Sequence, residues 1–294
     1  MVAAGNKKPF APPHELAELH GLAGLPLRAA TTVLRRPRGV PEFPRGAVRV
    51  RQVTADVGKL KAYREVCGLA SAATLPLTYP HVRAESLHLW LLARPEFPLP
   101  LLGLVYLANR IEQAQPIAVD RALDYAVRLD AAQRTERGLE FELMTTASAG
   151  RVQLWEGVNT YLYRMRREAP KPDNKAVSAT LPRLEPQQSL SVPGDTGRRY
   201  AAVSGDYNPI HLHPLSARLF GFPRAIARGM WSAARCLALL ETAYATAPEK
   251  MRLRFRQPLL LPAQTELRSR KAGEGVEFLL VGKRDRLYLE ETLS

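Results

Sequence analysis

One segment near the C-terminus, Ile226–Ala245, constrains the fold of this chain most. It is apolar around most of its helical circumference, and its only charged side chains are Arg228, Arg235 and Glu241. A helix with this pattern is buried on several sides. Strand-like runs follow it, at residues 251–261, 264–272, 275–283 and 286–293. We therefore predict an α+β domain in which an antiparallel sheet curls around one buried helix.

The first half of the chain repeats this order of elements. A strand-like run of alternating apolar and polar residues begins at Ala47, and helical stretches follow at residues 57–69 and 85–92. Long strand-like runs come next, at residues 102–115, 123–133 and 139–164, the last with a turn at Ala149-Gly150. The two halves share little residue identity, so the repeat is one of structure rather than of sequence.

Changes in composition suggest where the units begin and end. Residues 1–46 are rich in proline and arginine and read as an N-terminal lead-in segment, with one short helical pattern at 14–19. Residues 165–185 are charged, contain prolines and have almost no large apolar side chains, which is typical of a linker. We expect a first domain at residues 47–164 and a second at 186–294.

The bulk composition narrows the class of protein. No apolar run of about 18 residues and no signal peptide is evident, so we expect a cytoplasmic protein without a membrane partner. The two cysteines, Cys67 and Cys236, form no Cys-x-x-Cys motif, which excludes a zinc ribbon or a thioredoxin-type site. The net charge of +14 favours anionic partners. The basic residues are scattered and no nucleic-acid-binding motif is present, so we expect no nucleic-acid partner.

The residues best suited to chemistry lie between positions 200 and 230. Asp206 and His211 are five residues apart in a loop that Pro209 stiffens, and Gly205 permits a tight turn just before the aspartate. Gly229 stands at the start of the long apolar helix, where backbone N–H groups lack partners and carry the positive end of the helix dipole. An acid–base pair beside such an oxyanion donor suits reactions next to a carbonyl group.

This stretch resembles the hydratase motif of the MaoC-like, R-specific enoyl-CoA hydratases. The matching pattern is Ser-Gly-Asp-x-Asn-Pro-x-His at residues 204–211, then Ala217, Gly221-Phe222 and Ile-Ala-x-Gly-Met at 226–230. The whole chain is similar to the double-hotdog members, in which only the C-terminal half keeps the motif. Residues 98–111 resemble the N-terminal half of those proteins more weakly. At one position the chain departs from the family, which usually has histidine where Arg228 stands.

The resemblance implies both a fold and an activity. The fold is a double hotdog, in which each of two antiparallel sheets wraps around a helix. The activity is reversible hydration of a trans-2-enoyl thioester, carried by coenzyme A or an acyl-carrier protein, to the (3R)-3-hydroxyacyl thioester. Asp206 and His211 would activate water and the Gly229 N–H would bind the thioester oxygen. We expect Ser204, Asn208, Arg228 and Met230 to contact the substrate. Coenzyme A enters with the substrate, no separate cofactor is expected, and a homodimer is one option for assembly.

Other interpretations of the same residues stay open from sequence. The chain could be a non-catalytic acyl-thioester-binding or assembly subunit that kept the fold, and Arg228 is the only residue that favours this. His211, His213 and Asp206 could in principle hold a metal, but Pro214 and the absence of a further Cys/His cluster speak against a metal site. Three arginines that alternate along one strand-like run would form either a solvated sheet face or a phosphate-binding face for coenzyme A: Arg252, Arg254 and Arg256.

Overall fold

The computed structural model describes residues 14–19, 32–35, 41, 43, 46–101, 103–164, 184–245 and 247–294. The first half contributes β2 (Ala47–Val53), α2 (Val57–Cys67), α3 (Tyr79–Ala93), β3 (Leu104–Gln113), β4 (Leu123–Thr135), β5 (Gly138–Ala149) and β6 (Val152–Tyr163). The second half contributes β7 (Glu185–Val192), α4 (Thr196–Ser204), α5 (Pro209–Leu212), α6 (Pro214–Leu219), α7 (Gly229–Tyr244), β8 (Lys250–Phe255), β9 (Ala263–Ala272), β10 (Gly275–Gly282) and β11 (Arg286–Leu293).

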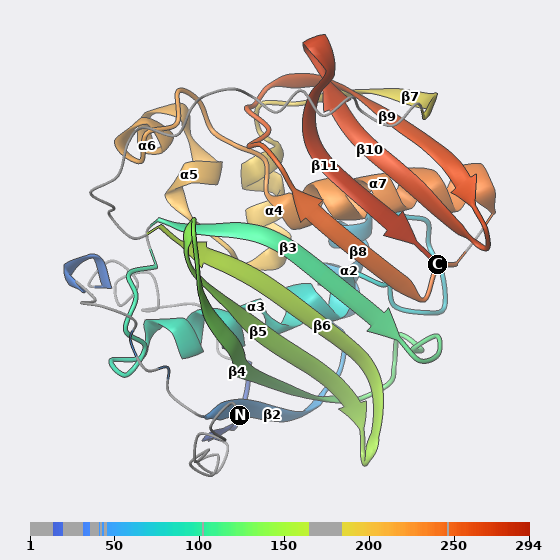
Figure 1. The fold of residues 1–294 in the computed structure, drawn as a ribbon. Coiled ribbons are helices and arrows are strands. Elements are labelled where there is room, and N and C mark those ends of the chain that lie inside the picture. The colour runs from blue at the N-terminus through green and yellow to red at the C-terminus, as the bar shows by residue number, and fades with distance from the viewer. Residues whose placement is uncertain are drawn as a thin grey trace, which may run out of the picture.

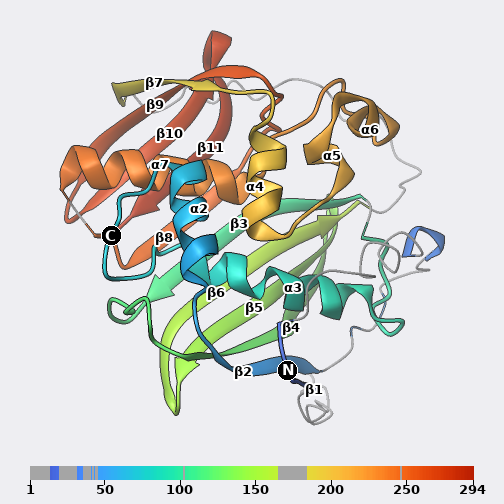
Figure 2. The same cartoon turned by 180° about the vertical axis from the view of Figure 1, so that it is seen from behind.

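All strands of the described residues join one sheet, with the helices α2, α3, α4 and α7 on one of its faces (Figure 1, Figure 2). With β1 (His14–Leu16) at one edge, the strand order is β1-β2-β4-β5-β6-β3-β8-β11-β10-β9-β7. The two halves meet where β3 pairs antiparallel with β8, from Ala108 opposite Arg254 to Glu112 opposite Lys250. Each half therefore keeps its own antiparallel strands, and one continuous ladder of hydrogen bonds joins them.

Each half buries one helix against its own strands. In the first half, α3 packs on β2, β4 and β5 (Figure 2). In the second half, α7 crosses behind β8, β10 and β11 and buries Met230, Trp231, Cys236, Leu237 and Leu240 among others (Figure 1). The pattern that predicted a helix buried on several sides is thus confirmed, together with the α+β arrangement.

The buried helix begins later than its apolar pattern suggested. The sequence predicted a helix from Ile226, but α7 starts at Gly229. Ile226 instead forms an isolated bridge to Leu260, and the N–H of Ala227 donates to the carbonyl of Leu259 at 2.8 Å. These two residues therefore bond to a neighbouring chain segment, which leaves the first free N–H groups of the helix at Gly229.

The lead-in segment holds a second difference from expectation. Residues 14–19 were predicted to be helical, whereas His14–Leu16 form β1, which pairs parallel with β2. The Glu15 carboxylate accepts two hydrogen bonds at 3.2 Å from Arg51 of β2. Pairing with the open edge of the sheet thus overrides the helical preference of this segment. Further along, Arg35 donates to the carbonyls of Leu92, Ala93, Arg94 and Leu99 at 2.8–3.2 Å.

Most of the predicted linker, residues 165–183, lies outside the described residues, as does most of the lead-in. Within the described part of the chain, no helix is both long and apolar enough to span a membrane.

Candidate active site

The loop that holds the predicted aspartate is braced by its own hydrogen bonds. Helix α4 ends at Ser204, and the residue that caps it, Gly205, adopts a left-handed conformation with φ 79°. The Ser204 hydroxyl then accepts the N–H of Asp206 at 3.2 Å, and Oδ1 of Asp206 accepts the N–H of Asn208 at 3.1 Å. Asn208 in turn caps α5 by accepting the N–H of Ile210 at 3.4 Å. Ser204 and Asn208 therefore shape the loop around Asp206.

His211 is buried, with 7% of its surface exposed, and its ring orientation is set by the backbone. Its Nδ1 lies 2.8 Å from the carbonyl oxygen of Ile226. Because a carbonyl can only accept a hydrogen bond, Nδ1 carries the proton, and in the neutral ring Nε2 keeps a lone pair. Burial lowers the pKa of His211, although the Ile226 carbonyl and the charge of Glu85 act in the opposite direction. The imidazole thus stands as a neutral base.

Gly229 is the first residue of α7 and leaves no room for a side chain. A Cβ added there would lie 2.7 Å from the ring of Phe255. The N–H groups of a first helical turn have no acceptor within the helix and carry the positive end of its dipole. Since His211 bonds to the carbonyl of Ile226, three residues upstream, the imidazole and this helix terminus belong to one small region.

Arg228, which stands where the family usually has histidine, joins this region to the first half of the chain. Nη1 of Arg228 pairs with Oδ2 of Asp206, and Nη2 pairs with Oε1 of Glu85 on α3. The side chains of Arg228, Asp206 and Glu85 are 24%, 16% and 7% exposed. Burial alone would lower the pKa of the guanidinium, but Glu85 and the nearby Tyr161 and Tyr200 raise it above its ordinary value. Arg228 is therefore a fixed cation between two carboxylates.

Met230, the last of the predicted substrate-contacting residues, lies in the core. It is 1% exposed, and its sulfur accepts a hydrogen bond from the hydroxyl of Tyr106 at 3.6 Å. The Tyr106 ring stacks on Tyr161 with centroids 5.1 Å apart and lies 4.7 Å from the ring of Phe255. These aromatic side chains form an apolar floor beneath the first turn of α7.

Helix α3 brings buried polar side chains that the sequence analysis did not identify as functional. His81, Glu85 and His88 are spaced to share one helix face, and all are less than 8% exposed. Nε2 of His88 lies 2.7 Å from the Thr145 hydroxyl, and burial lowers the pKa of His88 to about 3. The available signal in the sequence was a carboxylate and two imidazoles among the mostly apolar residues of one helix, because such groups are seldom buried without a partner.

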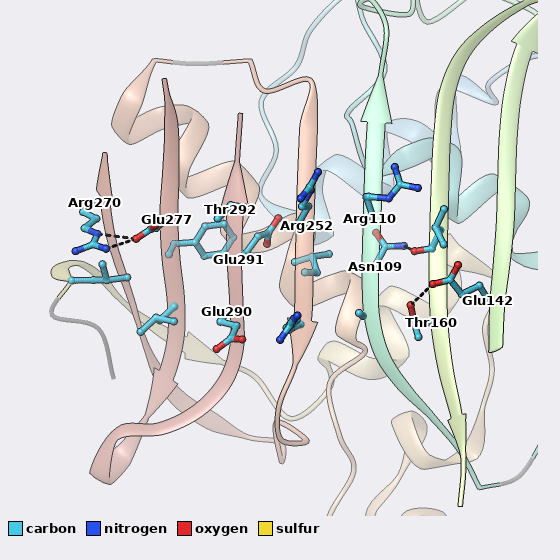
Figure 3. Close-up of a pocket in the computed structure, with 17 residues that line it drawn as sticks. Asn109, Arg110, Glu142, Thr160, Arg252, Arg270, Glu277, Glu290, Glu291 and Thr292 are labelled. Carbon is cyan, nitrogen blue, oxygen red and sulfur yellow. Dashed lines mark hydrogen bonds and ion pairs between the residues drawn. The ribbon is translucent and has the colours of Figure 1, made fainter. Parts of the chain in front are cut away.

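The three alternating arginines lie away from this region. Arg252, Arg254 and Arg256 are exposed, whereas Met251 and Leu253, which alternate with them, are buried and Phe255 is half-buried. Arg252 and Arg254 line an open hollow of about 800 Å³ on the sheet face opposite the helices, together with Arg110, Glu142, Glu290 and Arg270 among others (Figure 3). The sheet separates this hollow from Gly229 and His211, so the structure favours a solvated face for these arginines.

The described residues hold no group of three or more His, Cys, Asp or Glu side chains placed to bind a metal ion. His213, which could have joined such a group, caps α6 through its ring, where Nδ1 accepts the N–H of Leu215 at 3.2 Å.

Comparison with known proteins places the chain in a family. The sequence profile of the MaoC like domain matches residues 176–282, which hold all the predicted site residues. The chain is also 37% identical over 253 residues to 3-hydroxyacyl-thioester dehydratase X of Mycobacterium tuberculosis (strain ATCC 25618 / H37Rv), covering 84% of this chain and 88% of that protein. The chain belongs to the MaoC-like dehydratase family. It is thus an enzyme of the dehydratase/hydratase class, which confirms the predicted family and class and overturns the alternative of a non-catalytic subunit.

Solved structures agree with this assignment. The crystal structure of HtdX of Mycobacterium tuberculosis has a TM-score of 0.72 and 33% identity to the MaoC-like chain, covering 84% of this chain and 98% of that one. A MaoC-like dehydratase from Phytophthora capsici has a TM-score of 0.68 at 15% identity, covering 87% and 95% of the two chains. A further Mycobacterium tuberculosis protein described as having a double hotdog fold has a TM-score of 0.52 at 13% identity, covering 82% and 92%. The predicted double-hotdog fold is therefore confirmed.

Proposed function

We propose that this enzyme reversibly hydrates a trans-2-enoyl thioester to the (3R)-3-hydroxyacyl thioester, using Asp206, His211 and the N–H of Gly229. The observation that carries the proposal is the hydrogen bond from His211 Nδ1 to the carbonyl of Ile226, at 2.8 Å. It holds the imidazole as a base beside the first turn of α7, where an oxyanion can be stabilised. The related dehydratase of Mycobacterium tuberculosis is named for 3-hydroxyacyl thioesters, which supports this substrate class.

The reaction balances with water as the only co-reactant. In the hydration direction, Asp206 and His211 hold a water molecule, and one of them accepts a proton as the water oxygen forms a bond to Cβ of the enoyl group. The electron pair of the Cα–Cβ double bond moves toward the thioester carbonyl, and the proton taken from the water is then delivered to Cα. The buried His211, with its lowered pKa, is neutral near pH 7 and can take the proton first.

The thioester oxygen gains negative charge while the Cβ–oxygen bond forms. We propose that the N–H of Gly229 donates to this oxygen, because an N–H group at the start of a helix is fixed before the reaction and requires no reorganisation. Gly229 has no side chain, and the Phe255 ring packs where a Cβ would lie, which fixes the first turn of α7 against β8. Coenzyme A, or an acyl-carrier protein, is part of the substrate, and no electron carrier is needed to balance the reaction.

Hydration of crotonyl-CoA and of longer enoyl-CoAs, followed by the loss of absorbance of the conjugated thioester, tests the activity. Chiral analysis of the product tests the stereochemistry, and the (3R) alcohol is expected. An (S) product would contradict the proposed facial selectivity. No turnover with any enoyl-CoA or enoyl-acyl-carrier-protein substrate would overturn the proposed function as a whole.

A further inference from the structure

The Arg228 guanidinium has two anionic partners, and they come from different halves of the chain. Asp206 belongs to the loop before α5, and Glu85 belongs to α3, outside the region that the MaoC like domain profile matches. The two carboxylates bind different nitrogens of the guanidinium: Nη1 pairs with Asp206 and Nη2 with Glu85. The guanidinium therefore divides its two arms between the two carboxylates.

The other titratable groups around this cation do not neutralise it. Burial lowers the pKa values of His81 and His88 on α3, so both imidazoles are neutral near pH 7. Burial raises the pKa values of Tyr106, Tyr161 and Tyr200, so their hydroxyls are neutral as well. His211 on α5 is also neutral. Among the described groups that act on Arg228, only the two carboxylates carry negative charge, and losing either leaves a buried cation with one partner.

The consequence for Asp206 follows from the geometry of arginine. A guanidinium that has a single carboxylate partner tends to bind both oxygens with two parallel N–H donors. Asp206 held in this way would have both oxygens turned toward Arg228, and its negative charge would be more strongly stabilised. Such a carboxylate would hold water less well and accept a proton less readily. Glu85 prevents this arrangement, because it keeps Nη2 of Arg228 paired with its own carboxylate.

We infer that Glu85 is a positioning residue for the reaction. It binds Nη2 of Arg228, so that Asp206 keeps its orientation and its ability to accept a proton. This inference rests on the proposed function. It extends the site to the first half of the chain, which lacks the hydratase motif, and it gives a reason why arginine is tolerated at position 228. A change from Glu85 to glutamine should therefore affect catalysis only while Arg228 is present.

The experiment is a double-mutant cycle of Glu85→Gln and Arg228→Gln with an enoyl-CoA substrate. Glu85→Gln is expected to lower kcat by about 10- to 100-fold, as a small misplacement of a catalytic group does, and to leave KM within about threefold. In the Arg228→Gln background, the same change should cause little further loss. The acidic limb of the rate–pH profile should also move to lower pH in Glu85→Gln, because the charge of Glu85 raises the pKa of His211 and the substitution removes that charge.

A matched control and a second variant separate this role from a loss of folding. Thr145→Val removes a buried hydrogen bond to His88 on the same helix and leaves the Arg228 bridge in place, so it should keep kcat within about threefold. Glu85→Asp keeps the charge and should retain more activity than Glu85→Gln. If Glu85→Gln does not fold, Glu85→Asp replaces it in the double-mutant cycle, both in the wild type and in the Arg228→Gln variant.

The results that would overturn the inference are distinct from those that would overturn the function. If the wild type hydrates the substrate and Glu85→Gln does so equally well, the role of Glu85 is contradicted while the proposed function stands. Losses that multiply in the double variant contradict a role exerted through Arg228. A wild-type chain without hydratase or dehydratase activity contradicts the proposed function, on which this role depends.

Discussion

At the scale of single residues, the site depends on hydrogen bonds between side chains and the backbone. His211 is oriented by the carbonyl of Ile226, and Asp206 accepts the N–H of Asn208. Both contacts join residues that are close in sequence: His211 and Ile226 are 15 positions apart, and Asp206 and Asn208 are 2 positions apart. A loop and the approach to one helix therefore supply the proposed acid–base pair, and substitutions there should affect chemistry more than folding.

Removal of either member of the pair should show this. His211→Ala and Asp206→Asn are each expected to lower kcat by at least about 10²-fold, the usual effect of losing an acid–base group. Hydration kinetics with crotonyl-CoA measure the effect, and circular dichroism checks the fold. His213→Ala and Asp195→Asn serve as matched controls, because His213 caps α6 and Asp195 precedes α4 without a side-chain cap bond. Near-wild-type turnover in His211→Ala or Asp206→Asn would show that the residue has been given the wrong role.

The lowered pKa of His211 makes a second prediction at this scale. Burial penalises the charged imidazolium, so the neutral ring persists below the ordinary pKa of 6.5. The value of kcat/KM should therefore stay constant as the pH falls to 6.5 and decline only at lower pH. A rate–pH profile from pH 4.5 to 9 measures this. An acidic limb centred at or above pH 6.5 would contradict a buried, neutral base.

At the scale of elements, the first turn of α7 carries the proposed oxyanion donor, and its position depends on Gly229. A Cβ at this residue would lie 2.7 Å from the Phe255 ring of β8, so Gly229→Ala should push the helix end away from the sheet. We expect a loss in kcat of at least about tenfold, since displaced oxyanion donors lose most of their effect. Gly229→Ala combined with Phe255→Leu should recover part of the rate.

Gly46→Ala is the control for this prediction, because within the described part of the chain no heavy atom beyond its immediate neighbours lies within 4 Å of the Cβ that it would add. It should leave kcat unchanged. Unchanged kcat in Gly229→Ala as well would mean that the first turn of α7 does not bind the thioester oxygen.

At the scale of the whole molecule, one buried carboxyl links stability to pH. Glu291 of β11 pairs in register with Leu253 and Phe278, which are both buried. Neither of its side-chain oxygens has a hydrogen-bond partner in the described part of the chain, and burial raises its pKa well above 4.5. The folded protein therefore keeps a proton on Glu291 that the unfolded chain releases above pH 4.5.

This difference predicts that Glu291→Gln is more stable than the wild type at alkaline pH. The wild type loses about 1.4 kcal/mol of stability for each pH unit above 4.5, up to the folded-state pKa of Glu291. The variant carries no such loss. Denaturant unfolding at pH 5, 6.5 and 8 should show an advantage that is small at pH 5 and grows with pH. Glu290→Gln, at the neighbouring position that pairs with Arg256, should show no such growth. An advantage that is constant with pH would mean that Glu291 is ionised in the folded state.

The sequence alone determined the class of fold, and it predicted the residues of the candidate site. The apolar circumference of the segment at 226–245 and the repeated order of elements predicted two sheets with buried helices, because hydrophobic periodicity reports burial directly. Asp206, His211 and Gly229 could be singled out because the stiff loop and the helix start are local features. The sequence did not predict that residues 226–228 lie outside α7, or that residues 14–16 form a strand. Both depend on backbone pairing with distant segments, where the local pattern is ambiguous.

Only the tertiary structure decided which distant groups meet. Glu85 and Arg228 are 143 residues apart, and no periodicity or motif predicts their pairing. The packing of α3 and α7 on one continuous sheet brings them together, and the low polarity of that interior makes a partner necessary for each charge. Likewise, alternation along β8 placed its arginines on one face, but only the packing of α7 on the other face showed that the arginines lie opposite the helices. Contacts between elements far apart in sequence depend on how whole layers pack, and that information belongs to the fold as a whole.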